Sequence, residues 1–403
     1  MRLFVDKVLP KESDRKKYYS SLKNIIDNVI IGMQSMIDGL SWMKPESKEA
    51  AYAKIRNMVR NYVYPEWIMN DTNLTEYYFV LDPSFMNSGY PKMLMYVDQF
   101  LRRKDYDFLL RKSGTDRYDW GSLLTSVDAW YQDKLNSITI PLSILQAPFF
   151  NPDWPTSVNF GAIGYVAGHE LTHGFDSSGI SWGPFGESLE WLDPETKQHF
   201  DEMAKCVIEE YNTFCPLNAS YSPRCVNGEQ TQGENIADNG GIHAAYRAYR
   251  NIIDFYGPDP ALPGQLASKF THDQLFFLSF AQIWCEMPQP TDLIIKQLIN
   301  EDHSPSRYRV QGTIQNFPAF RSAFNCPIGS NSAPKDHCNV WISDANITSM
   351  NLSADPCNNF YEYACSALKG DILSDMNDKS FKTMVRMMDS MLEGDYQGVR
   401  NFI

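Results

Sequence analysis

The stretch HELTH, at residues 169–173, decides how this chain of 403 residues is interpreted. On an α-helix, residues four apart lie on one face, about 40° from each other. The imidazoles of His169 and His173 can therefore bind one metal ion, and Glu170 lies close enough to take a proton from a water molecule at that ion. Gly168, just before, permits the close approach of a neighbouring backbone. The stretch predicts a metal site on a helix.

A third ligand is needed, because a catalytic zinc site uses three protein ligands and leaves one position for water. Glu234 and Asp238 lie four residues apart in the segment GENIADNGG (residues 233–241). We assign Glu234 as the candidate third ligand and Asp238 as the acceptor that fixes the tautomer of a ligand histidine. Asp176 is a second candidate for that acceptor. An acidic pair at this spacing is by itself more often a solvated helix face.

Composition excludes several classes of protein. Lys+Arg total 36 against 49 for Asp+Glu, a formal charge of −13, which excludes a nucleic-acid binder held by phosphate contacts. Hydrophobic residues at 43% and charged residues at 21% exclude a disordered chain. No apolar run reaches the ~18–20 residues of a membrane span.

Local patterns predict a mainly α-helical protein with a small β-sheet. We expect helices over residues 13–60, 96–113, 161–176, 233–249 and 267–286, and a short strand over residues 137–140. Residues 70–95 and 206–225, which are rich in Asn, Ser or Pro, are expected to be loops.

Cysteines and glycosylation motifs indicate an extracellular setting. The chain has eight cysteines, none in a CxxC pair. Sequons of the form Asn-x-Ser/Thr occur at Asn70, Asn73, Asn218, Asn346 and Asn351. Together they favour an oxidising, extracellular compartment. The first residues are not a signal peptide, so we expect the chain to be part of a longer precursor.

Two further side chains could act on a peptide substrate. His303 precedes a Ser-Pro pair, and Arg309 follows six residues later. Peptide hydrolysis develops negative charge on oxygen, which a histidine donor near the metal would stabilise. The planar guanidinium of Arg309 could bind a substrate carbonyl or a terminal carboxylate. Taken alone, a histidine in a loop is more often a solvent-exposed residue without a catalytic role.

Several motifs resemble the neprilysin and endothelin-converting-enzyme family of zinc metallopeptidases. They occur in the order of that family and span nearly all of residues 1–341: SWMKPESKEAAYAKI (41–55), YPEW (64–67), SILQAPFF (143–150), HELTHGFD (169–176), GENIADNGG (233–241), HSPSRYRVQG (303–312) and CNVW (338–341).

The resemblance implies a thermolysin-like zincin (gluzincin) catalytic domain that cleaves peptides on the amino side of hydrophobic residues. It implies one zinc ion per chain, held by His169, His173 and Glu234. The remaining roles that it implies are a base at Glu170, an acceptor at Asp238 that orients a ligand histidine, a transition-state donor at His303 and a substrate-binding guanidinium at Arg309.

The resemblance also implies where substrate would bind. A hydrophobic specificity pocket is expected from Ile144, Phe149, Tyr165, Val166, Ile283 and Trp284, although core packing explains each of them equally well when taken singly. The family has Asn-Ala-Tyr/Phe where this chain has Asp128-Ala129-Trp130, and in the family this Asn binds the substrate backbone through hydrogen bonds. Asp128 keeps an acceptor but loses the amide donor and adds a charge. Gln311 replaces a usual Asn.

The order of segments is unusual for the family. Residues 1–341 resemble its catalytic half, whereas residues 342–403 contain DPCNNFYEYAC (355–365), which resembles the start of a family ectodomain. Two explanations remain. The chain is a piece of a longer tandem polypeptide, with an N-terminal half that caps the cleft preceding it, or the tail completes this unit in permuted order. We favour the tandem origin and expect that the tail can dock on residues 1–341.

The resemblance further implies disulfides that use all eight cysteines. They join Cys206 to Cys338, Cys285 to Cys365, Cys326 to Cys357, and Cys215 to Cys225 in a local loop.

The leading hypothesis is therefore a zinc-dependent endopeptidase acting on extracellular peptides. The alternative is a catalytically impaired, zinc-containing fragment or peptide-binding protein that lacks the family's cap, an idea that depends on Asp128 and the expected truncation. A helical secreted domain that binds no metal is a third, structural explanation.

Overall fold

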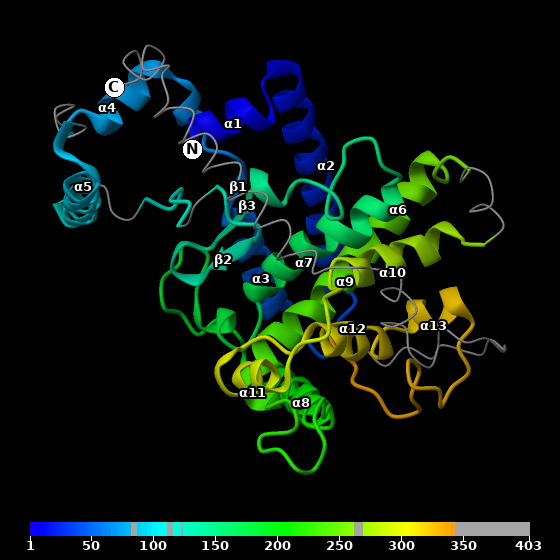
Figure 1. Ribbon diagram of the computed structural model, residues 1–403. Coiled ribbons are helices and arrows are strands. Elements are labelled where there is room, and N and C mark those ends of the chain that lie inside the picture. Colours follow the sequence, from blue (N-terminus) through cyan, green and yellow to red (C-terminus); the bar gives the residue numbers. More distant parts are fainter. Residues whose placement is uncertain (82–86, 111–115, 122–123, 262–268, 343–403) are drawn as a thin grey trace.

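The computed structural model describes residues 1–81, 87–110, 116–121, 124–261 and 269–342 (Figure 1). The first half contains α1 (Arg2–Val8), α2 (Glu12–Asp38), α3 (Pro45–Asn57), β1 (Val59–Val63), α4 (Asp71–Tyr78), α5 (Tyr90–Leu110), β2 (Trp130–Gln132), β3 (Ser137–Pro141), α6 (Thr156–Asn159) and α7 (Tyr165–His173). The second half contains α8 (Pro194–Tyr211), α9 (Gly228–Tyr256), α10 (His272–Gln282), α11 (Thr291–Asn300), α12 (Ser306–Gln315) and α13 (Pro318–Phe324). The expected combination of many helices with a small sheet is confirmed.

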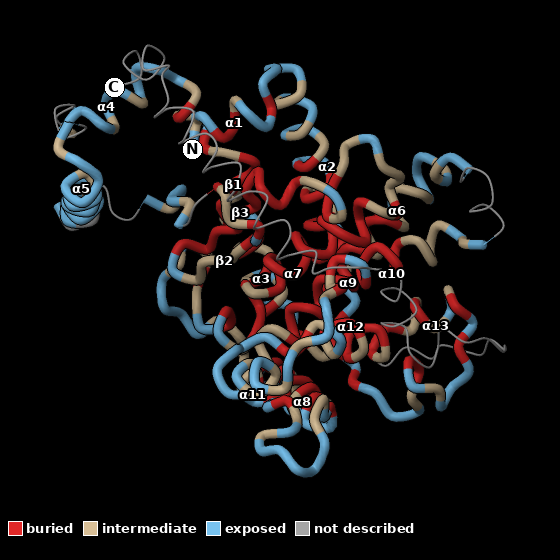
Figure 2. The backbone as a smooth tube through the Cα atoms, viewed as in Figure 1, coloured by how far each residue is buried: buried red, intermediate tan, exposed pale blue. Residues whose placement is uncertain are grey.

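The core is built around α7 and α9. Both α7 and α2 pack against α9, and α8 and α12 contact it as well. Figure 2 shows buried backbone gathered around α7, α9 and α10, while α4 and α5 are largely exposed. The helix that carries the HELTH stretch is thus an interior element, and its position is set by the long helix beside it.

Glycines allow this pair of helices to touch backbone to backbone. A Cβ atom added to Gly168 on α7 would lie 2.5 Å from the carbonyl oxygen of Gly241 on α9. One added to Gly241 would lie 2.6 Å from the backbone nitrogen of His169. Gly32 on α2 meets the Ala244 carbonyl oxygen of α9 in the same way, at 2.2 Å. These side-chain-free contacts bring the HELTH stretch directly onto α9.

A three-stranded sheet lies beside the helices, in the order β1-β3-β2. The central strand β3 pairs in parallel with β1, Val59 opposite Ser137. It pairs antiparallel with the edge strand β2, where Trp130 lies opposite Thr139. All residues of β3 are buried, which agrees with a central position. The strand expected at residues 137–140 is confirmed.

The structure differs from the expected elements at several ends. The helical region expected over residues 13–60 contains α2 and α3, but residues 59–63 form β1, because they pair with a strand distant in sequence. The loop expected over residues 70–95 contains α4 and the start of α5, and the Asn70 side chain caps α4 by accepting from the Asn73 N–H. Helix α8 runs to Tyr211, into the loop expected over residues 206–225. Helix α10 starts only at His272, after a capping box in which Thr271 and Gln274 bond reciprocally.

Two of the expected disulfides form within the described residues. Cys206 bonds to Cys338, and Cys215 bonds to Cys225. Cys285 and Cys326 are also disulfide-bonded, and the partners expected for them, Cys365 and Cys357, lie outside the described residues. The expected domain at residues 342–403 lies outside them too, apart from Ile342.

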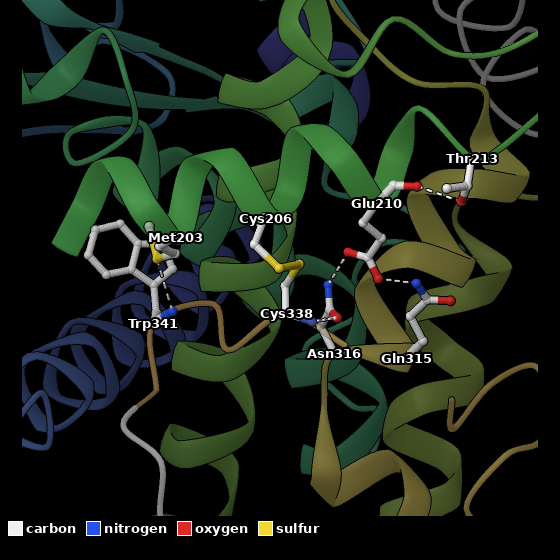
Figure 3. Close-up of a disulfide and its surroundings, with 8 residues drawn as sticks. All are labelled: Met203, Cys206, Glu210, Thr213, Gln315, Asn316, Cys338 and Trp341. Atoms are coloured by element: carbon white, nitrogen blue, oxygen red, sulfur yellow. Dashed lines mark hydrogen bonds between the residues drawn. A yellow bond between two sulfur atoms is a disulfide. The ribbon is translucent and has the colours of Figure 1, made fainter. Parts of the chain in front are cut away.

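A polar network surrounds the first of these disulfides and joins α8 to α12 (Figure 3). Glu210 on α8 accepts from the side-chain amide of Gln315 and, at 2.7 Å, from that of Asn316. The Asn316 side-chain oxygen in turn accepts from the backbone N–H of Cys338 at 2.9 Å. Burial raises the pKa of Glu210 to about 7, against the opposing effect of the two amides.

Among the described residues, none of the helices combines the length and the apolar character that a membrane span requires.

The contact between α7 and α9 can be tested by adding one methyl group. Gly241→Ala should lower the free energy of unfolding by about 2 kcal/mol or more, because the new Cβ meets backbone atoms that cannot move aside. Gly233→Ala on the same helix is the matched control, since its nearest neighbour is the Asp176 carboxylate at 3.4 Å. Urea denaturation of both variants measures the difference, and equal stability would contradict the packing constraint.

The raised pKa of Glu210 predicts a pH-dependent stability. The unfolded chain loses this proton near pH 4.5 and the folded protein only near pH 7, so wild-type stability falls as the pH rises between these values. Glu210→Gln cannot ionise and should gain on wild type by at most about 3 kcal/mol across that range. Denaturation at a series of pH values measures the gain. Glu209→Gln, an exposed neighbour, is the control, and an equal gain there would refute the assignment.

Candidate metal centre and cleft

Three side chains from two helices converge on one point. His169 and His173 of α7 bring their Nε2 atoms to 3.0 Å from each other. The Glu234 carboxylate of α9 lies 3.2 Å from Nε2 of His169 and 3.4 Å from Nε2 of His173. One ligand atom from each residue lies within 4.8 Å of the others, so the group could hold a metal ion. The structure therefore brings together the three ligands expected from the sequence.

The opposite ring nitrogen of each histidine faces a carboxylate. Nδ1 of His173 lies 2.7 Å from Oδ2 of Asp176. Nδ1 of His169 lies 2.9 Å from Oδ1 of Asp238, in close contact without hydrogen-bond alignment. These contacts favour the proton on Nδ1 and leave Nε2 of both rings for a metal. Both acceptors expected from the sequence thus occupy the positions that would orient the ligands.

Asp238 is the centre of a buried charge cluster. It is fully buried, and it accepts from Nε and Nη2 of Arg309 at 2.8 and 2.6 Å and from the hydroxyl of Tyr165 at 2.6 Å. Burial alone would raise its pKa, but the Arg309 charge and hydrogen bonds outweigh burial and lower the pKa to about 2. Asp238 is therefore a permanent anion that links α7, α9 and α12.

The electrostatics of the ligands favour a cation at the convergence point. Burial disfavours the charged form of His169, but the carboxylates of Asp238 and Glu234 outweigh it and raise its pKa to about 10. Burial likewise opposes ionisation of Glu234, whereas its contacts with His169 and His303 hold its pKa well below the usual range. These anions concentrate negative charge at the point where a cation would bind, and binding of a metal ion there would release protons from imidazole.

A cleft opens next to this centre. Its volume is about 660 Å³, which is in the range of small-molecule and peptide sites. Its lining includes the candidate metal-ligand group, which is His169, His173 and Glu234. Polar side chains line it as well: Asp133, Glu170, Asp176, Gln297, His303, Ser304, Ser306 and Arg309. The remaining lining residues are 127–131 around the edge strand and the apolar residues Ile144, Phe149, Tyr165, Val166, Ile283 and Trp284.

Glu170 lies inside the cleft, one residue after the candidate ligand His169. Only 5% of its surface is exposed. Burial raises the pKa of its carboxyl group, against the opposing charges of His169 and His173. A carboxylate made more basic in this position is suited to accept a proton from a water molecule in the cleft.

His303 contacts the metal-ligand group from the loop before α12. Its Nε2 lies 3.0 Å from Oε2 of Glu234, and half of its side chain is exposed. Ser304 holds this loop against α9 by donating to the side-chain oxygen of Asn235 at 2.8 Å. The loop histidine is thus directed at the centre and partly open to a substrate.

Arg309 occupies its expected place in the cleft but is already engaged. The edge formed by Nε and Nη2 binds Asp238, and Nη2 also lies 3.4 Å from Glu234. Its guanidinium lies over the Trp284 ring at 4.0 Å. A substrate carboxylate cannot use the same edge without breaking a buried pair, so contact with a substrate carbonyl through the Nη1 side fits this geometry better.

Asp128 and Ala129 lie on the wall of the cleft, immediately before β2. The backbone N–H of Ala129 donates to the Asp128 carboxylate at 2.9 Å. The Asp128 side chain keeps solvent contact, yet the surrounding walls of the cleft desolvate it and raise its pKa, against the opposing effect of that N–H. The cleft therefore carries a carboxylate on its edge-strand side.

The apolar residues expected to form a specificity pocket all line this cleft. Each of them also packs in or against the hydrophobic core, so core packing and a place in the cleft wall do not exclude each other. The six residues are Ile144, Phe149, Tyr165, Val166, Ile283 and Trp284.

Sequence reasoning missed some of the residues in the cleft. Asp133, at the end of β2, lines it and accepts from the Ser178 hydroxyl at 3.0 Å. Gln297 of α11 reaches it from a helix with no motif. The contact between Tyr165 and Asp238 was also missed, although Tyr165 lies four residues before His169 and hence on the same helix face. That spacing was the available signal.

The sequence model of Peptidase family M13 matches residues 128–340, and a second model described by the same family name matches residues 1–65.

Individual proteins are also similar to this chain in sequence. Mouse "Membrane metallo-endopeptidase-like 1" is 36% identical over 344 residues, which are 84% of this chain and 43% of that protein. Human neprilysin is 34% identical over 345 residues, 84% of this chain and 44% of that protein. The chain thus spans less than half the length of the curated relatives it matches.

Solved structures also resemble the fold. A Mycobacterium tuberculosis zinc metalloprotease in complex with an inhibitor has a TM-score of 0.68 and 27% identity, with 84% of this chain and 50% of that chain covered. The "Haemonchus galactose containing glycoprotein complex" has a TM-score of 0.69 and 30% identity, covering 84% of this chain and 52% of that chain. These neighbours agree with the zincin fold expected from the sequence.

The buried pair of Asp238 and Arg309 predicts non-additive stability. Asp238→Asn should cost about 3–5 kcal/mol, because it leaves the guanidinium buried without its anion. Adding Arg309→Met should recover at least about 2 kcal/mol of that loss, since no unpaired charge remains. Tyr165→Phe, which removes only a hydroxyl, is the control. Denaturation of the metal-free wild type, Asp238→Asn, Arg309→Met, the double variant and Tyr165→Phe measures the free energies of unfolding, and losses of the two single variants that add up in the double variant would contradict a charge pair.

Proposed function

Because the chain belongs to peptidase family M13, we propose that its cleft hydrolyses peptide bonds with the help of one bound zinc ion. The observation that carries the proposal is the convergence of His169, His173 and Glu234 beside the buried carboxylate of Glu170.

The donor set fits zinc. Two imidazole nitrogens and one carboxylate are the protein ligands of many catalytic zinc sites, and they leave a position open for water. Both rings are backed by carboxylates, which raises their basicity as ligands. Zinc, when bound, supplies Lewis acidity that polarises a carbonyl group and lowers the pKa of water.

The residues of the cleft divide the proton chemistry between them. Glu170 takes the proton of the attacking water and later gives it to the departing amine nitrogen. His303, half-exposed next to Glu234, donates a hydrogen bond to the oxygen of the scissile carbonyl as negative charge develops there. Asp176 and Asp238 hold His173 and His169 in the orientation that points Nε2 at the centre.

The apolar wall determines which bond is cleaved. Val166 lies three residues before His169 on α7 and shares its helix face, so the wall begins next to the metal centre. We include in the proposal that this wall receives a hydrophobic side chain just after the scissile bond, so that cleavage occurs on its amino side. Arg309, stacked on Trp284, would bind the carbonyl of the same residue through Nη1.

Asp128 would modify the choice of substrate. A carboxylate at the edge strand accepts a backbone N–H of a bound peptide as an amide oxygen does, but it cannot donate to a carbonyl. Asp133 adds a second carboxylate to the same cleft. Substrates with a positive charge near the scissile bond should therefore bind better than acidic ones.

The proposal places this activity outside the cytosol. Two disulfides are typical of oxidising compartments. Asn70, Asn73 and Asn218, three of the sequon positions, are exposed and hence accessible to glycosylation.

A single substitution separates metal binding from catalysis. Glu170→Gln should keep one zinc per chain and lose at least about 10³-fold in kcat/KM, because the amide cannot accept the proton of water. Zinc content and cleavage of a quenched peptide library measure the two properties. Wild type should cut before Phe or Leu. Glu229→Gln, an exposed change in the first turn of α9, is the matched control and should behave as wild type.

The outcomes separate the possible explanations. Cleavage retained by Glu170→Gln would refute its role as the base. Wild-type protein with zinc but without cleavage would refute the peptidase proposal for this chain, and wild-type protein without zinc would refute the metal site.

A further inference from the structure

Lys54 is a buried cation outside the cleft. It lies on α3, and only 1% of its surface is exposed. Its ammonium donates to two backbone carbonyl oxygens, that of Gly179 at 2.6 Å and that of Trp182 at 2.8 Å. Both carbonyls belong to the turn that follows α7, so a side chain from the N-terminal part of the chain holds the segment next to the metal centre.

The same turn holds the carboxylate that contacts the second histidine ligand. Oδ1 of Asp176 accepts from the backbone N–H groups of Ser178 at 2.8 Å and Gly179 at 2.7 Å. Its other oxygen, Oδ2, lies 2.7 Å from Nδ1 of His173. Gly179 therefore contacts both side chains: its backbone N–H donates to Asp176, and its carbonyl oxygen accepts from Lys54.

The turn also packs tightly against the end of α7. A Cβ atom at Gly179 would lie 2.0 Å from the carbonyl oxygen of His173 and 2.6 Å from the carbonyl carbon of Gly174. A shift of the turn is therefore transmitted to the backbone of the ligand histidine as well as to Asp176.

The charge on Lys54 has a specific environment. The carboxylates of Asp133, Asp176 and Glu187 face it electrostatically, and the rings of Tyr131 and Phe175 lie within 6 Å. Burial lowers the pKa of Lys54 to about 8, against the opposing effect of these carboxylates, so the ammonium remains mostly charged at neutral pH. A buried ammonium is costly unless it satisfies polar groups, and here it satisfies two carbonyls.

We propose that Lys54 is a positioning residue for the metal site, acting through the Gly179 turn and Asp176 on His173. The inference rests on the metal site of the proposed function. It assigns a role to a residue in the motif SWMKPESKEAAYAKI (residues 41–55), about 120 residues before the ligand that it positions.

A general structural role is the rival explanation, because other side chains also hold this region. Nδ2 of Asn136 donates to the carbonyl oxygen of Pro184, and Arg117 does the same. These contacts lie beyond Trp182 and do not involve Asp176. A role limited to holding the loop would lower stability in every background, whereas positioning of His173 through Asp176 requires that carboxylate.

A double-mutant cycle on zinc release distinguishes the two. The variants are Lys54→Met, which keeps the length of the side chain and removes the ammonium, Asp176→Asn, and the two combined. Each 403-residue protein is loaded with zinc, and the release rate into an excess of a chromophoric chelator is measured. Lys54→Met should release zinc about tenfold faster than wild type, and less than about twofold faster when Asp176→Asn is already present.

The controls keep the result interpretable. Lys48→Met changes another lysine of α3, which donates to the Asp38 carbonyl and not to the turn, and it should release zinc at the wild-type rate. If Lys54→Met does not fold, Lys54→Gln, whose amide keeps a donor, replaces it and should give a smaller acceleration of the same kind.

The outcomes are decisive for the proposal. An acceleration that disappears in the Asp176→Asn background supports positioning through Asp176. No acceleration, or the same acceleration in both backgrounds, overturns it while leaving the metal site intact. Wild-type protein that holds no zinc overturns the metal site itself, and with it this inference.

Discussion

The buried ion pair between Asp238 and Arg309 is the interaction on which the rest of the site depends. A carboxylate with no solvent contact is strongly unfavourable unless it is paired and hydrogen-bonded. Here the guanidinium supplies two hydrogen bonds, and Tyr165 supplies a third. The anion is therefore stable in the interior, where it can face Nδ1 of His169. One charge pair thereby connects a ligand on α7, its neighbour on α9 and the helix that follows the His303 loop.

This arrangement also requires α7 and α9 to lie unusually close together. Glu234, the candidate third ligand, and the buried Asp238 are on α9, while both histidines are on α7. Contact between the backbones at Gly168 and Gly241 brings the two helices near enough for these side chains to meet. Larger residues at these two positions would move the helices apart, and the side chains that form the centre could no longer reach one another. Packing and chemistry are in this way set by the same pair of glycines.

Much of the centre could be predicted because its information is local. The histidines four residues apart, the acidic pair at the same spacing and the glycine before the first histidine all follow from the geometry of a helix. Contacts between distant segments could not be predicted in this way. Residues 59 and 60 lie at the end of the expected helical region, yet residues 59–63 form β1 because β3 offers them a parallel partner. Likewise, Asn70 looks like part of a loop in the sequence, but it is the cap of α4. The engaged edge of Arg309 depends on Asp238, 71 residues away.

The contacts of Lys54 likewise could not be predicted from the sequence. Within α3 it has the appearance of an ordinary lysine among helix formers, and such a residue is normally solvated. Only the tertiary structure places its ammonium against the carbonyls after α7. The cost of burying that charge is offset locally, by two hydrogen bonds and three facing carboxylates. An apolar residue would fill the space without meeting those needs, and the carbonyls of the turn would be left unsatisfied. The orientation of His173 is therefore connected to residues that no single motif contains.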